Sequence, residues 1–488
     1  MATASSFSVR ATLEKAREYS KAELERRVEE SKMKIKSLET QPELRDRECA
    51  VLAVMKYLLS PIYAMPAELL AEIFERAIDE ETHIEDVFRM SQVCSDWRQV
   101  AHNTPQLWTG PLYVTLDNKG DKREQAHTDG WKAWLARSAA LPIPITLALE
   151  SADIYHDLLG EVLKTAFRWR SFQLDFPSHG LLLLRRVAQH ALDSLEELDL
   201  GDRDFFEPLG GVIPTFTSAP RLRKLKMCIF SSPPILVPWA NLTDLTLRYC
   251  SSPDVALDVL APCLGLTRLS VRTLGWPVPP RARQDTLTLT HLHTLSFALF
   301  GTAKNFAPFF GNLSAPALQE LWLNFGGMQG WENWTETTFT TFQLQAPNIT
   351  RLDLEYADLT SDEFRAVLLH APSLTHLKLF RCSCFDDATM TALRYKEGIA
   401  TLVPRLHNLV LEGMVHRVSD DILAEMIASR WWTNAALASD SPPPAAACWT
   451  RVELWYDLSE HSFLKDIPSD ILMTSTRSHS GRDHFLFE

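Results

Sequence analysis

The sequence predicts an all-α N-terminal part followed by a larger α/β part, a solenoid with a parallel sheet on its concave face and helices outside. Three observations lead to this fold class. Apolar residues recur at helical spacing as far as about residue 108. A unit Leu-x-x-Leu-x-Leu then recurs along most of the remaining chain, and segments with helix-start signals lie between its copies. One such unit cannot bury its leucines alone, so stacked copies must supply the core.

The N-terminal segment 11–40 is highly charged and contains neither Gly nor Pro, so we expect a helix there that ends at Pro42. Heptad seam positions in it are occupied by Leu24, Val28, Ile35 and Leu38, with Ser31 as a polar gap. Two interpretations stay open. The helix either packs this stripe on its neighbour in the same chain or dimerises through it as a short coiled coil. A second helix is expected over roughly 45–59.

The stretch 62–108 carries two apolar helical patterns separated by a polar turn at 79–82. Pro66 is expected at the first position of the first helix, because its missing N–H costs nothing there. The first pattern consists of Leu69, Leu70, Ile73, Phe74 and Ala77. The second is expected to be one helix and consists of Ile84, Val87, Phe88, Met90, Val93, Cys94, Trp97, Val100 and Ala101. About 45 residues bury little surface, so these helices need a partner or the rest of their chain.

This stretch resembles the F-box, whose pattern is Leu-Pro-x-Glu-Leu-Leu-x-x-Ile-Phe, then Val-Cys-x-x-Trp-Arg, then Pro-x-Leu-Trp. The three parts read Met65–Phe74, Val93–Arg98 and Pro105–Trp108, with Met65 in place of the usual Leu. The lead-in of a charged helix and Leu58-Leu59-Ser60-Pro61 resembles that of fungal F-box proteins. The resemblance implies docking on the Skp-family adaptor of a cullin–RING ubiquitin ligase. The residues that it assigns to docking are Met65, Pro66, Leu69, Leu70, Ile73, Phe74, Val93, Cys94 and Trp97, of which some must instead be core.

Between Trp108 and the repeats, strands are expected at 112–116 and 143–149, where apolar residues alternate. The polar segment 117–128 is expected to be a loop. Helices are expected at 130–138 and around 153–167.

The repeated unit has nine strong copies, which begin at Leu195, Leu222, Leu242, Leu266, Leu292, Leu318, Ile349, Leu374 and Leu406. Weaker copies begin at Trp169 and Trp449, and the steps between strong copies run from 20 residues (Leu222 to Leu242) to 32 (Leu374 to Leu406). This pattern resembles irregular leucine-rich repeats of the kind that commonly follow an F-box. Helix starts between copies are Ser252-Pro253, the capping box Thr360–Glu363, and Asp420-Asp421.

The residues that alternate with the leucines are expected to face outward from the sheet in two rows. The first row is Asp199, Lys226, Thr246, Ser270, Ser296, Trp322, Asp353, Lys378, Val410 and Glu453. The second is Gly201, Cys228, Arg248, Arg272, Ala298, Asn324, Glu355, Phe380, Glu412 and Trp455. Charges of both signs with aromatic side chains suit a protein or peptide partner. The candidate substrate face comprises Arg248, Arg272, Trp322, Phe380 and Trp455; the alternative is a solvated face with no dominant contact.

Composition narrows the function classes. The net charge of −13 argues against sequence-independent binding of nucleic acid, which needs a basic field. No run of about 18 apolar residues indicates a membrane span. The 8 cysteines form no disulfide framework, which favours a cytoplasmic or nuclear location. No catalytic motif is present, so we expect no enzyme, cofactor or metal. Two alternative sites are considered. The carboxylates Asp199, Asp202, Asp204 and Glu207 would serve acid–base chemistry or bind a hard cation. A zinc site would be formed by Cys382, Cys384, His370 and His376.

We therefore expect five segments. Residues 1–60 form a charged helical lead-in, 61–109 the F-box, 110–168 a linker and solenoid cap, 169–474 the leucine-rich repeats and 475–488 a tail. The expected function is that of a substrate-recognition adaptor in a Skp–cullin–F-box ubiquitin ligase, which binds the Skp-family adaptor, through it a cullin, and an unknown protein substrate. The alternative is a ubiquitin-independent repeat scaffold whose box is only structural. A metal-dependent hydrolase would need a site that the sequence does not offer.

Overall fold

The computed structural model describes residues 9–38, 40–63, 65–79, 81–116, 122–149, 157–175, 180–201, 215–229, 235–250, 252–276, 285–300, 307–326, 336–413, 418–431, 446–454 and 467–474. The chain forms two compact units, one of Met1–Pro111 with Gln125–Leu141 and one of Leu112–Glu124 with Pro142–Glu488. None of the helices in the described part of the chain has the length and apolar character needed to cross a bilayer.

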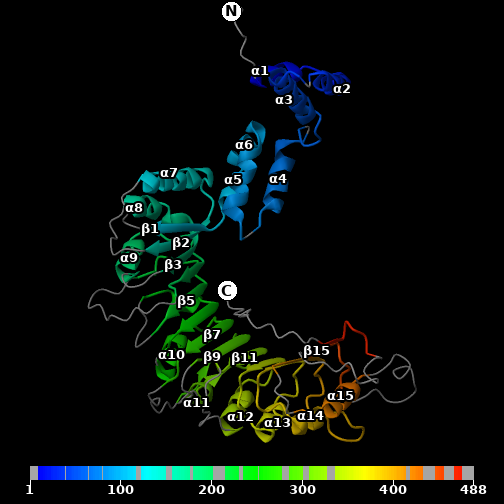
Figure 1. Cartoon of the computed structure of the whole chain (residues 1–488). Coiled ribbons are helices and arrows are strands. Elements are labelled where there is room, and N and C mark those ends of the chain that lie inside the picture. The colour runs from blue at the N-terminus through cyan, green and yellow to red at the C-terminus, as the bar shows by residue number, and fades with distance from the viewer. Residues whose placement is uncertain are drawn as a thin grey trace, which may run out of the picture. The chain divides into compact units, whose positions relative to one another are not determined.

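The first unit is helical, with a blue to cyan ribbon in Figure 1. Its elements are α1 (Val9–Ala16), α2 (Lys21–Ser37), α3 (Pro42–Leu58), α4 (Ala67–Ala77), α5 (His83–Val93), α6 (Ser95–His102), the 3₁₀ turn η1 (Pro105–Trp108) and α7 (Lys122–Arg137).

The single helix expected over 11–40 is two helices, because Ser20 interrupts it and caps α2 by accepting a hydrogen bond from the Glu23 N–H at 3.3 Å. Pro42 begins α3 rather than only ending the preceding helix, in agreement with the tolerance of proline in a first turn. The first half of the apolar stripe, Leu24 and Val28, is covered within the chain, and Ile35 and Leu38 are half-buried. Leu24 and Val28 are buried in one cluster with Ala16, Val54, Met55 and Leu58. The interpretation that α2 packs on its neighbour therefore agrees with this arrangement.

Three further expectations for the first unit are wrong in detail. The second helix of the box is divided into α5 and α6, because Cys94 adopts an extended backbone between them. Pro66 is the residue before α4 rather than its first helical residue, a shift of one position. The segment 117–128 is not all loop, since α7 begins at Lys122, where Lys, Arg, Glu, Gln and Ala are all good helix formers.

Within the described residues, the second unit is built on a parallel sheet of 14 strands that follow one another almost in chain order. This is the expected leucine-rich-repeat-like, solenoid-type α/β fold. The strands are β1 (Leu112–Leu116), β2 (Ile143–Leu149), β3 (Trp169–Asp175), β4 (Glu197–Asp199), β5 (Lys224–Cys228), β6 (Asp244–Arg248), β7 (Arg268–Thr273), β9 (Thr294–Leu299), β11 (Glu320–Asn324), β12 (Arg351–Glu355), β13 (His376–Phe380), β14 (Asn408–Glu412), β15 (Arg451–Leu454) and β16 (Leu472–Thr474). A small separate sheet pairs β8 (Leu287–Thr288) with β10 (Leu313–Ser314), which the repeat pattern does not predict.

Helices and short turns connect these strands, and in Figure 1 the helices lie along the outer side of the curved sheet. They are α8 (Asp157–Leu163), η2 (Ala166–Arg168), α9 (Gly180–Val187), η3 (Trp239–Asn241), α10 (Pro253–Leu260), α11 (Ala307–Gly311), α12 (Glu336–Gln345), α13 (Ser361–Leu369), α14 (Asp387–Leu393) and α15 (Asp420–Ala428).

The core of the second unit is a ladder of leucines in register. Leu198 pairs with Leu225, Leu225 with Leu245, and this continues through each repeat strand. All members of the ladder are buried: Leu198, Leu225, Leu245, Leu269, Leu295, Leu321, Leu352, Leu377 and Leu409. Because side chains alternate along a strand, the residues between these leucines must form rows on the opposite face.

The capping box expected at the start of α13 is present. Thr360 Oγ1 accepts a hydrogen bond from the Glu363 N–H at 3.3 Å, and Glu363 Oε2 accepts one from the Thr360 N–H at 2.8 Å.

Thr360→Ala is expected to lower the free energy of opening of α13 by about 1 kcal/mol, because an N–H of the first turn loses its acceptor. Hydrogen exchange of the α13 amides would measure this change. Arg365→Ala, an exposed site on the same helix, is the control and should change it by less than about 0.5 kcal/mol. Equal effects from the two substitutions would contradict a role for the cap.

Candidate protein-binding surfaces

The apolar residues of the box helices divide into a buried set and an exposed set. Leu70, Phe74, Leu107 and Trp108 are buried. The Phe74 ring lies 4.8 Å from the Trp97 ring and joins α4 to α6, and Trp108 Nε1 donates a hydrogen bond to the Ala101 carbonyl at 2.7 Å. These contacts fix the relative positions of α4, α6 and η1.

The same helices expose other apolar side chains. Leu69 and Ile73 are 52% and 46% exposed and, four residues apart, lie on one face of α4. Val93, at the end of α5, is 60% exposed, and Pro66 is exposed before α4. Met65, Cys94 and Trp97 are half-buried. The structure thus assigns Leu70 and Phe74 to the core and leaves Pro66, Leu69, Ile73 and Val93 accessible.

The cysteine of the box has a structural role. Cys94 caps α6, because its Sγ accepts a hydrogen bond from the Trp97 N–H at 3.4 Å. The Tyr57 hydroxyl from α3 lies 3.4 Å from this sulfur and donates a hydrogen bond to Asp96 Oδ2 at 2.8 Å. Burial, together with these two neighbours, raises the pKa of Tyr57. The lead-in helices are therefore joined to the box by a specific polar contact.

On the second unit, the outward-facing rows have the predicted register. Asp199 pairs with Lys226, Lys226 with Thr246, Thr246 with Ser270, and the row continues without a slip through Ser296, Trp322, Asp353, Lys378, Val410 and Glu453. The second row aligns Cys228 with Arg248, and Arg272 with Ala298, Asn324, Glu355, Phe380 and Glu412. Gly201 lies beyond the end of β4, and Trp455 lies outside the described residues.

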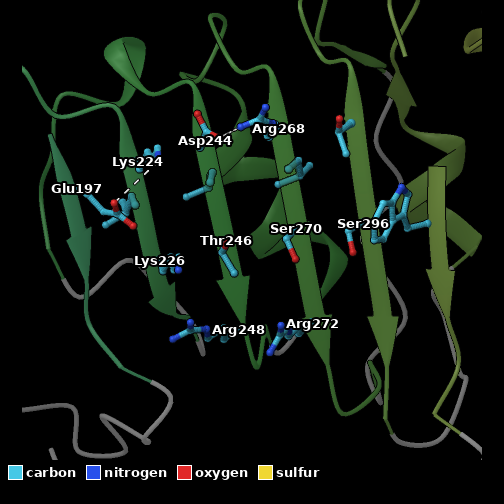
Figure 2. Close-up of a pocket in the computed structure, with 15 residues that line it drawn as sticks. Glu197, Lys224, Lys226, Asp244, Thr246, Arg248, Arg268, Ser270, Arg272 and Ser296 are labelled. Carbon is cyan, nitrogen blue, oxygen red and sulfur yellow. Dashed lines mark hydrogen bonds and ion pairs between the residues drawn. The ribbon is translucent and has the colours of Figure 1, made fainter. Parts of the chain in front are cut away.

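A shallow pocket of about 260 Å³ opens on this face between β4 and β11 (Figure 2). Its floor consists of the small side chains Thr246, Ser270 and Ser296 on three neighbouring strands. Lys226 precedes them in the same row and Trp322 follows them, so large side chains flank a low floor. The hollow arises directly from this pattern of side-chain sizes.

Five cations and two carboxylates are among the side chains that line this pocket: Lys224, Lys226, Arg248, Arg268, Arg272, Glu197 and Asp244. The two carboxylates lie where the strands begin. Lys224 Nζ is 4.0 Å from Glu197 Oε2, and Arg268 Nη1 is 3.3 Å from Asp244 Oδ1. At the other end of the strands Arg248 and Arg272 lie side by side (Figure 2).

Asp199 holds the edge of the pocket in place. Its carboxylate lies 3.2 Å from Arg248 Nη1 and 3.9 Å from Lys226 Nζ. It also accepts a hydrogen bond from the Gly201 N–H at 2.9 Å. Gly201 has φ of +75°, and a Cβ there would lie 2.6 Å from the Leu174 carbonyl oxygen, so the turn requires glycine.

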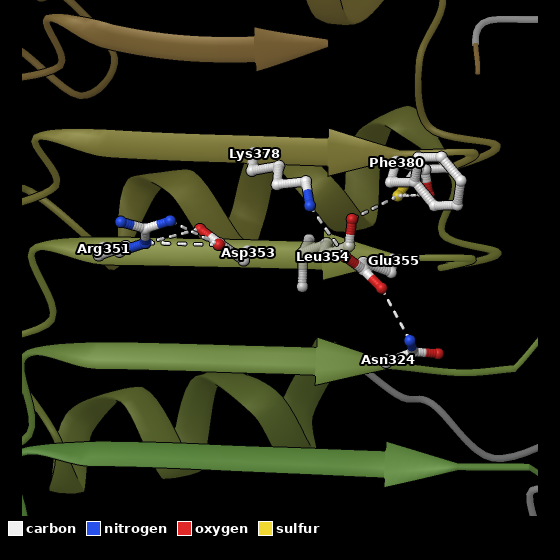
Figure 3. A network of polar contacts seen from close by, with 8 residues as sticks. Asn324, Arg351, Asp353, Leu354, Glu355, Lys378 and Phe380 are labelled. Atoms are coloured by element: carbon white, nitrogen blue, oxygen red, sulfur yellow. Dashed lines mark hydrogen bonds and ion pairs between the residues drawn. The ribbon is translucent and has the colours of Figure 1, made fainter. Parts of the chain in front are cut away.

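A separate polar network lies on β11 to β13 (Figure 3). Glu355 accepts hydrogen bonds from Asn324 Nδ2 at 2.7 Å and from Lys378 Nζ at 3.0 Å. Arg351 Nη2 lies 3.0 Å from Asp353 Oδ2. Burial raises the pKa of Asp353, and Arg351 opposes this change.

The candidate substrate residues therefore divide into two places. Arg248, Arg272 and Trp322 line the pocket. Phe380 lies on β13, where its ring is 5.1 Å from that of Tyr356 and 5.3 Å from the Arg381 guanidinium. Sequence reasoning missed a third row at the strand starts, which alternates in charge along Glu197, Lys224, Asp244 and Arg268. The sequence feature that could have revealed this row is the charged residue immediately before the second leucine of each of these copies.

Among the residues that the structure describes, no group of three or more His, Cys, Asp and Glu side chains gathers in a way that could hold a metal ion. Of the four carboxylates considered above, Asp202, Asp204 and Glu207 lie outside the described residues. Cys382 Sγ instead contacts the Leu354 carbonyl at 3.4 Å, a structural position in its repeat.

Comparison with known proteins identifies one domain. Residues 62–112 match the family model described as F-box-like, so the chain carries an F-box-like domain there. No curated protein matches the chain.

Among solved structures, the chain is similar to one in the Toll–Spatzle complex of Drosophila, with 13% identity and a TM-score of 0.35, over 72% of this chain and 49% of that one. It is also similar to one in the Rad7–Elc1 complex of yeast, with 15% identity and a TM-score of 0.34, over 72% and 89%. A Bacteroides fragilis protein has 13% identity and a TM-score of 0.26, over 60% and 75%. The chain thus spans about half the length of the Toll–Spatzle chain that it matches. We take no function from these likenesses.

Proposed function

We propose that this chain is the substrate-recognition subunit of a Skp–cullin–F-box ubiquitin ligase. The F-box-like domain would bind a Skp-family adaptor and, through it, a cullin, and the outward face of the repeat sheet would bind a protein substrate. The chain would itself be no enzyme, since transfer of ubiquitin would be performed by other subunits on a substrate held nearby.

The observation that carries this proposal is the F-box-like segment 62–112, whose apolar residues fall into two sets. Leu70 and Phe74 fill the core, whereas Leu69, Ile73 and Val93 are exposed. Exposed apolar side chains at helical spacing suit a groove in a partner, which they would enter from one face of α4. Single exposed leucines are common on any protein, so the proposal that this face binds an adaptor depends on the family match.

Each of the predicted segments has its own proposed role. We propose that 1–60 supports the box, that 61–109 docks the adaptor, that 110–168 caps the solenoid except for Gln125–Leu141, which belongs to the first unit, and that 169–474 presents the substrate face. The polar contact of Tyr57 with Asp96 supports the first assignment, because it joins α3 to α6.

The direct test is adaptor binding by the purified chain with Leu69 and Ile73 replaced by aspartate. We expect the dissociation constant for a Skp-family adaptor to rise at least about 100-fold, because two charges would be desolvated in an apolar interface. Isothermal titration calorimetry would measure the change. Both side chains are about half exposed, so the double variant should keep its helical circular dichroism.

Leu264→Asp is the matched control, because Leu264 is also an exposed leucine but lies in the repeat unit. It should leave adaptor binding unchanged. No adaptor binding by the unaltered chain would reject the ligase proposal. It would leave the alternative, a ubiquitin-independent repeat scaffold whose box is only structural.

A further inference from the structure

We propose that the pocket between β4 and β11 binds an acidic, extended segment of the substrate, rich in Asp or Glu. This inference rests on the proposed function, in that it assumes a protein substrate on the repeat sheet. It names the chemical class of the segment and its place on that sheet.

The first argument is the uneven distribution of charge on the outward face. Strands β4 to β9 carry five cations, Lys224, Lys226, Arg248, Arg268 and Arg272, against the three carboxylates Glu197, Asp199 and Asp244. Strands β11 to β14 carry two cations, Arg351 and Lys378, against the four carboxylates Glu320, Asp353, Glu355 and Glu412. The chain as a whole has a net charge of −13, so the basic half stands out from the average surface. An acidic segment would be attracted by one half and repelled by the other, which would fix its position.

The second argument is the geometry of the cations. Arg248 is the last residue of β6, and Arg272 lies one residue before the end of the adjacent parallel strand β7, beside it on the same face of the sheet (Figure 2). Like charges close together on neighbouring strands are unfavourable, and Asp199, 3.2 Å from Arg248 Nη1, offsets part of this repulsion. A carboxylate of the ligand would lower the repulsion further. Arginine also suits this ligand, because its planar fork can donate two hydrogen bonds to one carboxylate.

The third argument is the size and shape of the hollow. Four strand spacings separate β5 from β11, or about 19 Å, which an extended peptide covers with about six residues. The low floor of Thr246, Ser270 and Ser296 leaves room for a backbone and offers hydroxyl donors. Trp322 closes one end with an apolar surface for a side chain of the peptide.

The test is fluorescence anisotropy with the full chain and a fluorescein-labelled dodecapeptide of alternating glutamate and glycine. The same peptide with glutamine in place of glutamate is the ligand control. We expect the glutamate peptide to bind at least about tenfold more tightly than the glutamine peptide, with affinity that falls as salt is raised.

Lys226→Gln combined with Arg272→Gln should weaken binding of the glutamate peptide on the order of tenfold, and Lys226→Arg should retain it. Lys378→Gln is the matched control, because Lys378 lies in the same row as Lys226 and also contacts a carboxylate of a neighbouring strand, Glu355 at 3.0 Å. It should change binding less than about twofold. Thermal unfolding of each variant would establish that it folds.

Equal binding of the two peptides, equal loss from the Lys226→Gln/Arg272→Gln variant and from Lys378→Gln, or binding only of a third peptide with phosphoserine in place of glutamate would overturn the proposal. Adaptor binding by the same preparation separates the two hypotheses. Glutamate-peptide binding without adaptor binding would support this pocket and reject the ligase role. Adaptor binding with no preference for the glutamate peptide would reject the pocket alone.

Discussion

Phe74→Ala is expected to destabilise the F-box-like domain by about 3–5 kcal/mol, whereas Ile73→Ala, one residue away, should cost less than about 1 kcal/mol. Phe74 is 2% exposed and its ring contacts that of Trp97, so truncation would leave a cavity between α4 and α6. Ile73 is 46% exposed and fills no cavity.

Hydrogen exchange in the full chain would measure this difference, because it reports the opening of α4 and α6 separately from that of the second unit. Adaptor affinity should respond to Ile73→Ala, the substitution that leaves stability almost unchanged. Ile73→Ala should weaken adaptor binding while the exchange rates stay unchanged. Exchange that is equally fast in both variants would show that the division into core and surface on α4 is wrong.

The sequence predicted the type of most elements because local pattern and tertiary packing agree in them. Each Leu-x-x-Leu-x-Leu copy gave a strand, and the alternation of leucines with other residues gave the row register from Asp199 to Glu453. Failures occurred where a single side chain decided the backbone. Ser20 and Cys94 each end a helical pattern by capping the next helix, yet apolar spacing continues through both positions.

The candidate surfaces were predicted in part. Apolar spacing and the family motif singled out nine residues in the box, but they could not separate Leu70 and Phe74 from Leu69 and Ile73, since all four follow the same motif. On the sheet, single positions such as Arg248 and Trp322 were found from their row. The pocket itself was not, because it depends on the succession of small side chains across strands that are more than 20 residues apart in the chain. Parallel pairing of distant segments brings such side chains together, and composition along the chain does not reveal it.

Arg430 is another residue that the sequence did not indicate, and it stabilises the end of the solenoid from inside. Its side chain is fully buried. The guanidinium donates hydrogen bonds to four carbonyl oxygens, those of Leu393 at 3.2 Å, Leu402 at 2.7 Å, Val403 at 3.2 Å and Leu406 at 3.3 Å. It also lies 5.4 Å from the centre of the Trp449 ring. One side chain thus joins the end of α14, the loop before β14 and the approach to β15.

Burial lowers the pKa of Arg430 to about 10, which still leaves the guanidinium charged at neutral pH. A buried cation needs partners, and here carbonyl dipoles are among them. The hydrogen bonds are the reason why the position requires arginine, because a guanidinium has five N–H donors in a fixed plane, whereas lysine has three on one nitrogen.

Arg430→Met is therefore expected to destabilise the last repeats by at least about 3 kcal/mol, because four carbonyl oxygens would each lose a charged hydrogen-bond donor while the side-chain volume is nearly kept. Arg430→Lys should have an intermediate effect. Exchange of the amides of β14 and β15 would report the loss, while those of β5 to β7 should stay protected, since neighbouring repeats interact mainly with one another. Arg405→Met, at an exposed arginine in the same loop, is the control and should cost less than about 0.5 kcal/mol. If Arg430→Met were no worse than this control, the four carbonyl contacts would contribute little, and the position of β14 and β15 would depend on the leucine ladder alone.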